Sequence, residues 1–254
     1  MRRVIKIGGR AQGDARLIVQ LAAATHRGES LVVVHGGGDE VSVLQRRLGI
    51  EPQFRGGRRV TSVADLELVR MVLSGATNKR LVAQLLSVGV RAVGVSGEDD
   101  GLLMAHVTDP DFGRVGGAIT AHPAVLTHLW SGGFIPVVSP LGRDADDPQG
   151  GGLNVNGDDA AAAIAAALGA DEILFVADVP GVLAESGATL AELDSAAAQA
   201  LVVSGVAKGG MAAKLEAGAL ALRGGVRRAR VGDLCAITDA TAGTRLTLCS
   251  VLAD

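Results

Sequence analysis

The 254-residue sequence contains no tyrosine, one tryptophan and only four phenylalanines. Proteins that bind single-stranded nucleic acid stack the bases on aromatic side chains, so this scarcity argues against that kind of binding. The net charge of -3 comes from 24 basic and 27 acidic residues, and both signs are spread along the chain. No basic stripe is available to follow nucleic acid or an anionic lipid surface. We therefore expect neither nucleic acid nor a membrane as a partner.

Cysteine and long apolar runs are also scarce. The two cysteines, Cys235 and Cys249, are too few for a disulfide framework and too far apart for a CxxC pair, so we expect two buried thiols. No apolar run approaches the ~20 residues that a membrane-spanning helix needs. Strand-like residues begin almost at Met1, so we expect no secretory signal. These features predict a cytoplasmic protein.

Three familiar motifs of nucleotide-binding proteins and hydrolases are missing. The sequence has no GxxxxGK[ST] P-loop and no GxGxxG between a strand and a helix, which disfavours the P-loop and dinucleotide-binding folds. The run His35-Gly36-Gly37-Gly38 matches the oxyanion-hole motif of esterases. That class also requires a GxSxG nucleophile elbow, and none exists here. An ester hydrolase is therefore disfavoured.

Glycine, in contrast, is abundant at 36 residues. Two buried strands are predicted at 4–7 and 31–34, and each is followed by glycines, Gly8-Gly9 and Gly36-Gly37-Gly38, and then by a helix. This β-α-β opening predicts a parallel sheet. Glycine loops at the carboxyl edge of such a sheet expose backbone N–H groups where anions bind. Together the two loops favour a polyphosphate cradle over a pair of purely structural turns.

The rest of the chain continues the alternation of strands and helices. We predict a hairpin at 53–61, a capping box from Ser62 to Asp65, an antiparallel patch after residue 101 and a polar loop or hairpin tip at 144–152. Further strands are expected at 92–96, 135–138 and 172–176, and helices at 14–26, 39–48, 159–168 and 210–224. Pro136 favours a first-residue or edge position for its strand. Length alone allows either one large α/β domain or two lobes.

The few lysines suggest the chemistry. Lys6 lies in a buried strand beside Gly8, and Lys214 follows Gly210 by about one helical turn. Phosphoryl transfer needs positioned cations and amides more than covalent chemistry, so two lysines flanking the phosphoryl group would suffice. They would repel each other unless a carboxylate lay between them, and Asp158 is placed to do this. Taken alone, Lys214 is by default a solvated helix residue, and Asp158 is equally compatible with a helix N-cap.

At this point the chain resembles the amino acid kinase family, and within it the members that phosphorylate N-acetyl-L-glutamate. The resemblance covers essentially the whole chain and is carried, in order, by Lys6-Ile7-Gly8-Gly9, Val34-His35-Gly36-Gly37-Gly38, Gly57-Arg58-Arg59-Val60-Thr61, Asn78-Lys79, Asn154-Val155-Asn156-Gly157-Asp158, Asp178-Val179-Pro180-Gly181 and Gly209-Gly210-Met211-Ala212-Ala213-Lys214. Each motif is weak alone, whereas the seven together in this order and spacing are highly specific.

The resemblance implies an α/β fold, an open αβα sandwich with a mainly parallel central sheet. It implies an N-terminal lobe, residues 1–169, that binds the acylamino acid, and a C-terminal lobe, residues 170–254, that binds ATP with Mg²⁺ held mainly by the nucleotide phosphates. No residue of the chain is expected to be a dedicated metal ligand.

The resemblance also implies the roles of individual residues. Lys6 and Lys214 would stabilise the transferring phosphoryl group, with Asp158 orienting them. The residues implied for the nucleotide are Gly8, Gly9, Gly37, Gly38, Asp178, Gly181, Gly210 and Met211. Those implied for the acylamino acid are Gly36, Gly37, Arg59, Asn154 and Asn156, with Arg59 holding the α-carboxylate as a bidentate fork. Ala177 stands where a small polar residue is expected beside Asp178, which is a departure from the family pattern.

Two alternative functions are also compatible with the sequence. A kinase of the same fold that acts on a carrier-protein-linked aminoadipate would carry extra basic residues in its arginine loop, and this loop contains Arg55, Arg58 and Arg59. A non-catalytic ligand sensor of the same fold would have lost a lysine or Asp158, and neither loss is seen.

The resemblance also suggests an assembly. Family members that arginine inhibits carry an N-terminal helix that links dimers into a hexamer, and only Met1, Arg2 and Arg3 precede the first predicted strand. We therefore expect a homodimer that arginine does not inhibit.

Overall fold

The two apolar strands at the start of the chain lie side by side in a parallel sheet, as predicted. The structure is a computed structural model that describes residues 1–147, 149, 151–184 and 186–249. β1 (Arg2–Ile7) pairs with β2 (Ser30–Val34) on one side and with β11 (Glu172–Val176) on the other. The full sheet has eight strands in the order β12-β14-β13-β11-β1-β2-β8-β5, parallel except where β13 meets β14.

The remaining strands are β3 (Phe54–Arg55), β4 (Arg58–Arg59), β5 (Ala92–Ser96), β6 (Leu103–Val107), β7 (Val115–Ala121), β8 (Ile135–Ser139), β9 (Leu141–Asp144), β10 (Gly152–Val155), β12 (Glu192–Asp194), β13 (Ala229–Gly232) and β14 (Thr244–Thr247). The α-helices are α1 (Ala15–His26), α2 (Gly38–Arg47), α3 (Val63–Arg70), α4 (Asn78–Ser87), α5 (Ala124–Ser131), α6 (Gly157–Ala167), α7 (Ser195–Val203) and α8 (Gly210–Arg223). Shorter turns are η1 (Gly9–Gly13), the π-helical η2 (Met71–Thr77), η3 (Asp99–Gly101), η4 (Pro110–Phe112) and η5 (Leu234–Ile237).

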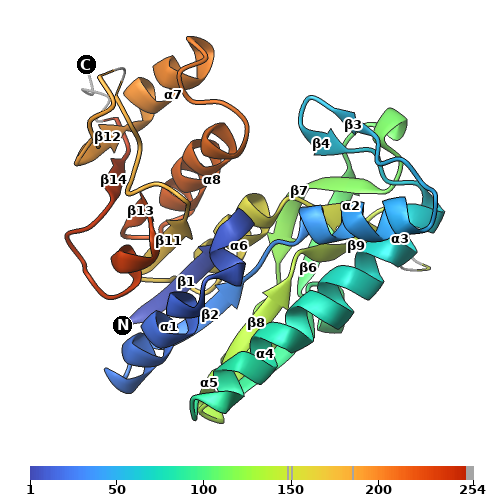
Figure 1. Cartoon of the computed structure of the whole chain (residues 1–254), viewed down its shortest axis with the longest axis horizontal. Helices are drawn as coiled ribbons and strands as arrows, with labels where there is room; N and C mark the ends of the chain where they lie inside the picture. The colour runs from blue at the N-terminus through green and yellow to red at the C-terminus, as the bar shows by residue number, and fades with distance from the viewer. Residues whose placement is uncertain (148, 150, 185, 250–254) are drawn as a thin grey trace.

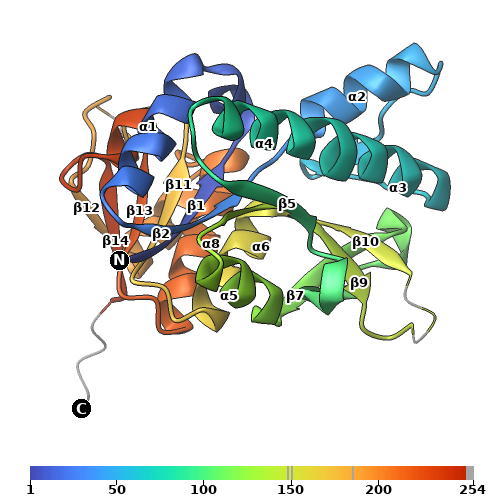
Figure 2. The ribbon, with the colours of Figure 1, turned by 90° about the horizontal axis from the view of Figure 1, so that it is seen from below.

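Strand alternation divides the buried residues between the two faces of the sheet. On one face, Ile5, Val33 and Leu174 pack with residues of α1 and α4. On the other, Val32 and Phe175 pack with residues of α6 and α8. Figures 1 and 2 show these helices covering opposite faces. This arrangement confirms the predicted α/β sandwich with a mainly parallel sheet. Alternate side chains of each strand therefore contact the helices on opposite faces of the sheet.

A smaller barrel extends the fold beside this sheet. It is closed by β10, β7, β6 and β9, and β6 pairs antiparallel with β7, which confirms the predicted antiparallel patch. The strands β9 and β10 also pair antiparallel, so the polar segment predicted at 144–152 joins a hairpin; its residues 148 and 150 lie outside the described part of the chain. The hairpin β3–β4 forms a separate two-stranded sheet with Gly56 and Gly57, both at positive φ, in its turn.

Local signals for helix ends are confirmed in detail. Asp14 accepts from the backbone N–H of Arg16 at the start of α1, and Ser62 and Asp65 form the reciprocal capping box of α3. One element was not foreseen. The helical stretch between α3 and α4 is π-helical over Met71–Thr77, a form that occurs mostly as single turns, frequently at functional sites.

Two expectations are wrong. The strand β8 lies inside the sheet, between β2 and β5, although it contains Pro136. The N–H of Ile135 donates to Arg91 on the β5 side, so the alternation of the ladder turns position 136 towards β2, whose pairing with β8 begins only at Val137. The missing proline N–H therefore removes no hydrogen bond from the ladder.

The two cysteines, expected to be buried, are both exposed. Cys235 belongs to η5, where the buried neighbours Leu234, Ala236 and Ile237 fill the core and leave position 235 on the outer side.

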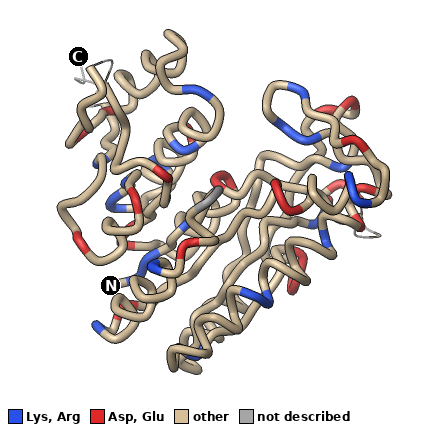
Figure 3. Tube along the Cα trace, viewed as in Figure 1, with Lys and Arg blue, Asp and Glu red and all other residues tan. Residues whose placement is uncertain are grey.

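Charged residues of both signs are interspersed along the trace rather than collected on one side (Figure 3). Within the described part of the chain, no helix is both long enough and apolar enough to cross a membrane.

Candidate active site

Lys6 and Val4 lie on the same face of β1. Alternation along β1 turns both residues to the side of the sheet covered by α6 and α8. Only 7% of Lys6 is exposed. A lysine is rarely this buried unless it is paired, and here the partner is Asp158, whose Oδ1 lies 2.8 Å from the Lys6 Nζ.

Lys214 comes to the same carboxylate from α8. The helix begins after Gly209, which adopts φ +52, and Lys214 lies one turn inside it, with Nζ 3.3 Å from the carbonyl oxygen of Gly210. The same Nζ lies 3.5 Å from Oδ2 of Asp158, and the residue is 8% exposed. The default reading of Lys214 as a solvated helix residue is therefore wrong.

Asp158 is free to serve both lysines because another side chain caps its helix. Asn156 is the N-cap of α6, and its Oδ1 accepts from the backbone N–H groups of Asp158 at 2.7 Å and Asp159 at 3.3 Å. The alternative in which Asp158 is only an N-cap is therefore wrong. Its two carboxylate oxygens face one lysine each.

The electrostatics of this cluster bear mainly on Lys214. Burial lowers the pKa of Lys214, and the positive charge of Lys6 lowers it further, while Asp158 acts in the opposite direction. Two ammonium groups close together in a largely buried place repel each other, and one carboxylate offsets only part of that repulsion. The cluster is consequently short of negative charge and suited to an added anion.

Glycines keep the space beside the lysines open. A Cβ placed on Gly8 would lie 3.1 Å from the Nζ of Lys6 and 3.6 Å from that of Lys214. A Cβ on Gly157 would lie 3.3 Å from Cε of Lys6. The loop Gly36-Gly37-Gly38 approaches from the end of β2, with Gly37 at φ +140. Bare backbone thus surrounds the two ammonium groups, as a phosphate cradle requires.

Two cavities meet at that glycine loop. The larger, of about 870 Å³, is lined by Lys6, Gly8, Gln12, Gly13, Gly36, Gly37, Gly38, Asp39, Glu40, Gly57, Arg80, Gln84, Asp158, Gly210 and Lys214. The smaller, of about 270 Å³, is lined by Gly36, Gly37, Gly38, Asp39, Val41, Phe54, Gly57, Arg58, Arg59, Val69, Leu73, Val115, Gly116, Pro140, Asn154, Val155, Asn156, Gly157 and Asp159. We call these the lysine cavity and the arginine cavity. All five residues predicted for the acylamino acid line the arginine cavity.

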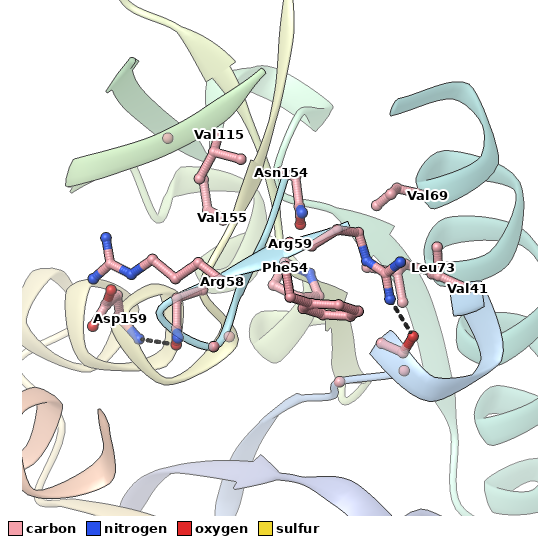
Figure 4. A pocket seen from close by; sticks show the side chains of 18 of the residues that line it. Val41, Phe54, Arg58, Arg59, Val69, Leu73, Val115, Asn154, Val155 and Asp159 are labelled. Carbon is pink, nitrogen blue, oxygen red and sulfur yellow. Dashed lines mark hydrogen bonds between the residues drawn. The ribbon is translucent and has the colours of Figure 1, made fainter. Parts of the chain in front are cut away.

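Arg59 is held inside the arginine cavity by neighbours that the sequence did not reveal. Its Nη2 donates to the carbonyl oxygen of Gly38 and to Oγ of Ser42, both at 2.7 Å, and its Nη1 donates to Oε1 of Gln45. The guanidinium also lies 4.7 Å from the ring centroid of Phe54 (Figure 4). Burial is the main cause that lowers its pKa, and the guanidinium remains charged at neutral pH.

Other residues of the arginine cavity were also missed. Val41, Val69 and Leu73 form an apolar wall, as Figure 4 shows. Asp159 carries a pKa raised mainly by burial, and Arg58 extends towards it from the hairpin. One sequence feature could have indicated these residues: Val41 and Gln45 are four residues apart, so they share one face of the helix that directly follows the glycine loop.

Three of the predicted nucleotide residues are not among those that line the two cavities: Asp178, Gly181 and Met211. Gly9 opens η1 next to Gly8. Asp178 lines a separate cavity of about 280 Å³ with Asp14 and Arg16. Gly181 packs so closely that a Cβ would lie 2.6 Å from Oγ1 of Thr244, and Met211 is half-buried against the core. Their contact with a nucleotide stays a prediction.

This fold and site belong to a known class. A sequence model of the amino acid kinase family matches residues 1–233, so the chain belongs to that family. The acetylglutamate kinase of Cereibacter sphaeroides is 42% identical over 253 aligned positions, covering 95% of this chain and 86% of that protein. The acetylglutamate kinase of Rubrobacter xylanophilus is 45% identical over 223 positions, covering 88% of this chain and 85% of that protein. The crystal structure of smu.665 from Streptococcus mutans UA159 superposes with a TM-score of 0.86 at 30% identity, covering 97% and 98% of the two chains.

Proposed function

We propose that this chain has acetylglutamate kinase activity, transferring the γ-phosphoryl group of ATP to the side-chain carboxylate of N-acetyl-L-glutamate as a step in arginine biosynthesis. The observation that carries the proposal is the placement of Lys6 and Lys214 on either side of Asp158, beside a glycine loop shared with a cavity that holds a buried arginine. The identity of 42% to 45% with acetylglutamate kinases over most of the chain supports the substrate.

The reaction follows from this arrangement. Arg59 binds the α-carboxylate of the acylamino acid, and Asn154 and the apolar wall orient the rest of the molecule towards the glycine loop. The side-chain carboxylate is ionised at neutral pH, so it attacks without a general base. A bond forms between its oxygen and the γ-phosphorus, and the bond to the bridging oxygen breaks, leaving its electron pair on ADP.

Lys6, Lys214 and the loop amides stabilise the charge that develops on the phosphoryl oxygens. Mg²⁺ fits this site as an ion carried on the nucleotide, since Asp158, the carboxylate between the two lysines of the lysine cavity, already faces both of them, and the described residues contain no cluster of three or more His, Cys, Asp or Glu that could hold a metal. Its chemistry is to neutralise part of the phosphate charge.

The finer assignments belong to the same proposal. Residues 1–169 would form the acylamino-acid lobe and residues 170–254 the nucleotide lobe. Asp178, Gly181 and Met211 of the second lobe, and Gly9 of the first, would contact the nucleotide. A cytoplasmic homodimer fits the resemblance. Large apolar side chains exposed along one helical stretch support a dimer interface there: Val63 is 71%, Met71 62% and Leu86 53% exposed.

The test is an ATP-dependent hydroxamate assay with N-acetylglutamate, glutamate and aminoadipate side by side. Hydroxylamine traps only an acyl phosphate, so product with N-acetylglutamate alone supports the proposal. Product with aminoadipate and none with N-acetylglutamate would instead support the carrier-linked kinase, and the absence of product with all three would support a sensor.

A further inference from the structure

His35 opens the glycine loop yet has no part in the reaction described above. It is fully buried at the end of β2, and its Nδ1 lies 2.7 Å from the carbonyl oxygen of Gly36. Its Nε2 lies 3.2 Å from Nδ2 of Asn78, the first residue of α4. Asn78 is also fully buried, so two residues of the shared sequence motifs meet out of contact with solvent.

The neighbours of Asn78 fix which ring nitrogen of His35 carries the proton. Its Nδ2 donates to the carbonyl oxygen of Val137 at 2.9 Å, and its Oδ1 accepts from Nζ of Lys79 at 3.2 Å. Carbonyl oxygens only accept and ammonium groups only donate, so the amide can point only one way. The carbonyl oxygen of Gly36 can only accept, so the proton of the neutral ring lies on Nδ1, and Nε2 is left to accept from Asn78, whose Nδ2 has the carbonyl of Val95 at 3.4 Å as a longer alternative.

The charge state agrees with this geometry. Burial lowers the pKa of His35 to about 4, so the ring is neutral at neutral pH. The amide of Asn78 also packs directly against the backbone of β5, because a Cβ on Gly94 would lie 1.8 Å from Oδ1 of Asn78.

The orientation of the Gly36 carbonyl has a consequence for Gly37. The peptide between them is planar and trans, so the N–H of Gly37 points away from the carbonyl of Gly36. Since that carbonyl faces the buried ring of His35, the N–H of Gly37 points away from the ring, and Gly37 lines both the lysine and the arginine cavities. Within the described part of the chain this N–H donates to no other group.

We propose that His35 is a positioning residue, which as its Nδ1–H tautomer aims the N–H of Gly37 at the transferring phosphoryl group, and that Asn78 selects this tautomer. The catalytic part of this inference, in which the N–H of Gly37 is aimed at the phosphoryl group, rests on the proposed phosphoryl transfer. The tautomer itself is a property of the folded chain.

The first test is ¹⁵N NMR of the histidine rings, with the His35 signals assigned by their loss in a His35→Gln variant. The expected result is a protonated Nδ1 and an unprotonated Nε2 that do not change between about pH 6 and 8. A proton on Nε2, or a ring that titrates in this range, would overturn the inference even if the kinase is active.

The second test compares kcat in two variants of His35. Each variant can place an amide nitrogen at the position of one of the two ring nitrogens. The amide nitrogen of Asn can occupy the position of Nδ1, whereas that of Gln reaches the position of Nε2. We expect His35→Gln to lower kcat by about 10-fold or more with both KM values changed little, because a misdirected donor is lost mainly from the transition state. His35→Asn should keep kcat within about 3-fold of the wild type, as should the control His128→Gln at an exposed site.

A purely structural role predicts the reverse order, because Asn leaves the larger void. Equal kcat values in the Asn and Gln variants, or a larger loss with Asn, would contradict the inference. A wild-type protein that makes no acyl phosphate but shows the expected tautomer would refute the proposed function and leave the loop geometry intact.

Discussion

Lys6 and Asp158 form a buried ion pair, with Nζ 2.8 Å from Oδ1 and both side chains less than a tenth exposed. The pair joins the first strand of the chain to the start of α6, and the other carboxylate oxygen faces Lys214. The surplus positive charge of this cluster underlies the predictions for Lys6, Lys214 and Asp158.

Replacing either lysine should remove turnover and spare the fold. Lys6→Ala and Lys214→Ala should each lower kcat by about 10²-fold or more, because each deletes a donor aimed at developing charge. Asp158 keeps one lysine in either variant, so thermal melting should remain cooperative. Arg223→Ala, at the exposed end of the same helix as Lys214, is the matched control. A folded lysine variant with near-normal kcat would show that its assigned role is wrong.

Turnover should fall at alkaline pH, earlier than an ordinary lysine would cause. Burial and then Lys6 lower the pKa of Lys214 below 10.5, and the reaction needs its protonated form, so kcat decreases as pH rises through that lowered value. Asp158 raises this pKa, so Asp158→Asn should move the decline to lower pH. The measurement is kcat against pH at saturating substrates. Glu216→Gln, on the same helix, should leave the midpoint unchanged, and a midpoint that Asp158→Asn does not move would contradict the assignment.

Arg59→Ala should act on one substrate. We expect the KM for N-acetylglutamate to rise by about 10-fold or more while the KM for ATP stays nearly constant, because a charged contact with the α-carboxylate is made in ground and transition states alike. Arg55→Ala, an exposed arginine of the same hairpin, controls for a general loss of positive charge. Equal weakening of both substrates would place Arg59 at the phosphates or in the structure instead.

Stability should depend on a second ionic cluster at the opposite end of β1. Glu172, which is 1% exposed, lies 2.6 Å from Nε of Arg3 and 2.8 Å from Nε of Arg230. Glu172→Gln would leave the buried Arg230 without its counter-charge and Arg3 with Glu29 alone, and it should lower the free energy of unfolding by about 3–5 kcal/mol in urea titrations. Glu67→Gln, at an exposed pair with Arg70, should cost less than about 1 kcal/mol.

The same cluster predicts the direction of acid sensitivity. Burial alone would raise the pKa of Glu172, but the hydrogen bond from Arg230 and the charge of Arg3 outweigh it and hold the pKa below 4.5. The contribution of Glu172 to the free energy of unfolding is fully present above pH 4.5 and is lost as the pH falls through the lowered pKa of Glu172. Glu172→Gln should flatten this acid limb, and an unchanged limb would exclude Glu172 as its source.

Assembly can be tested on the exposed helical stretch. We expect light scattering to give the mass of a dimer, and Met71→Asp to shift it towards the monomer, because a charge buried in an apolar interface lacks a partner. Val203→Asp, at a residue that is 77% exposed on α7, is the control and should leave the mass unchanged. A hexamer, or inhibition by millimolar arginine in a rate titration, would contradict the expected assembly.

The sequence by itself determined the order of strands and helices, the glycine loops and the helix caps. These features are local: apolar runs, glycine positions and capping residues act within a few residues of one another, so one chain is enough to read them. The motifs that contain Lys6, Asp158 and Lys214 are likewise local features of the sequence, so these residues can be identified as candidates without the fold.

Only the tertiary structure decided between alternative roles for a residue that the local sequence pattern could not distinguish. Whether Asp158 caps α6 or pairs with lysines depended on Asn156 taking the cap, and whether Lys214 is solvated depended on α8 packing against α6. The burial of Arg59 among Ser42 and Gln45, the inner position of β8 despite Pro136, and the contact of His35 with Asn78 all join segments far apart in sequence. Such contacts are set by packing across the sheet, which no local pattern encodes.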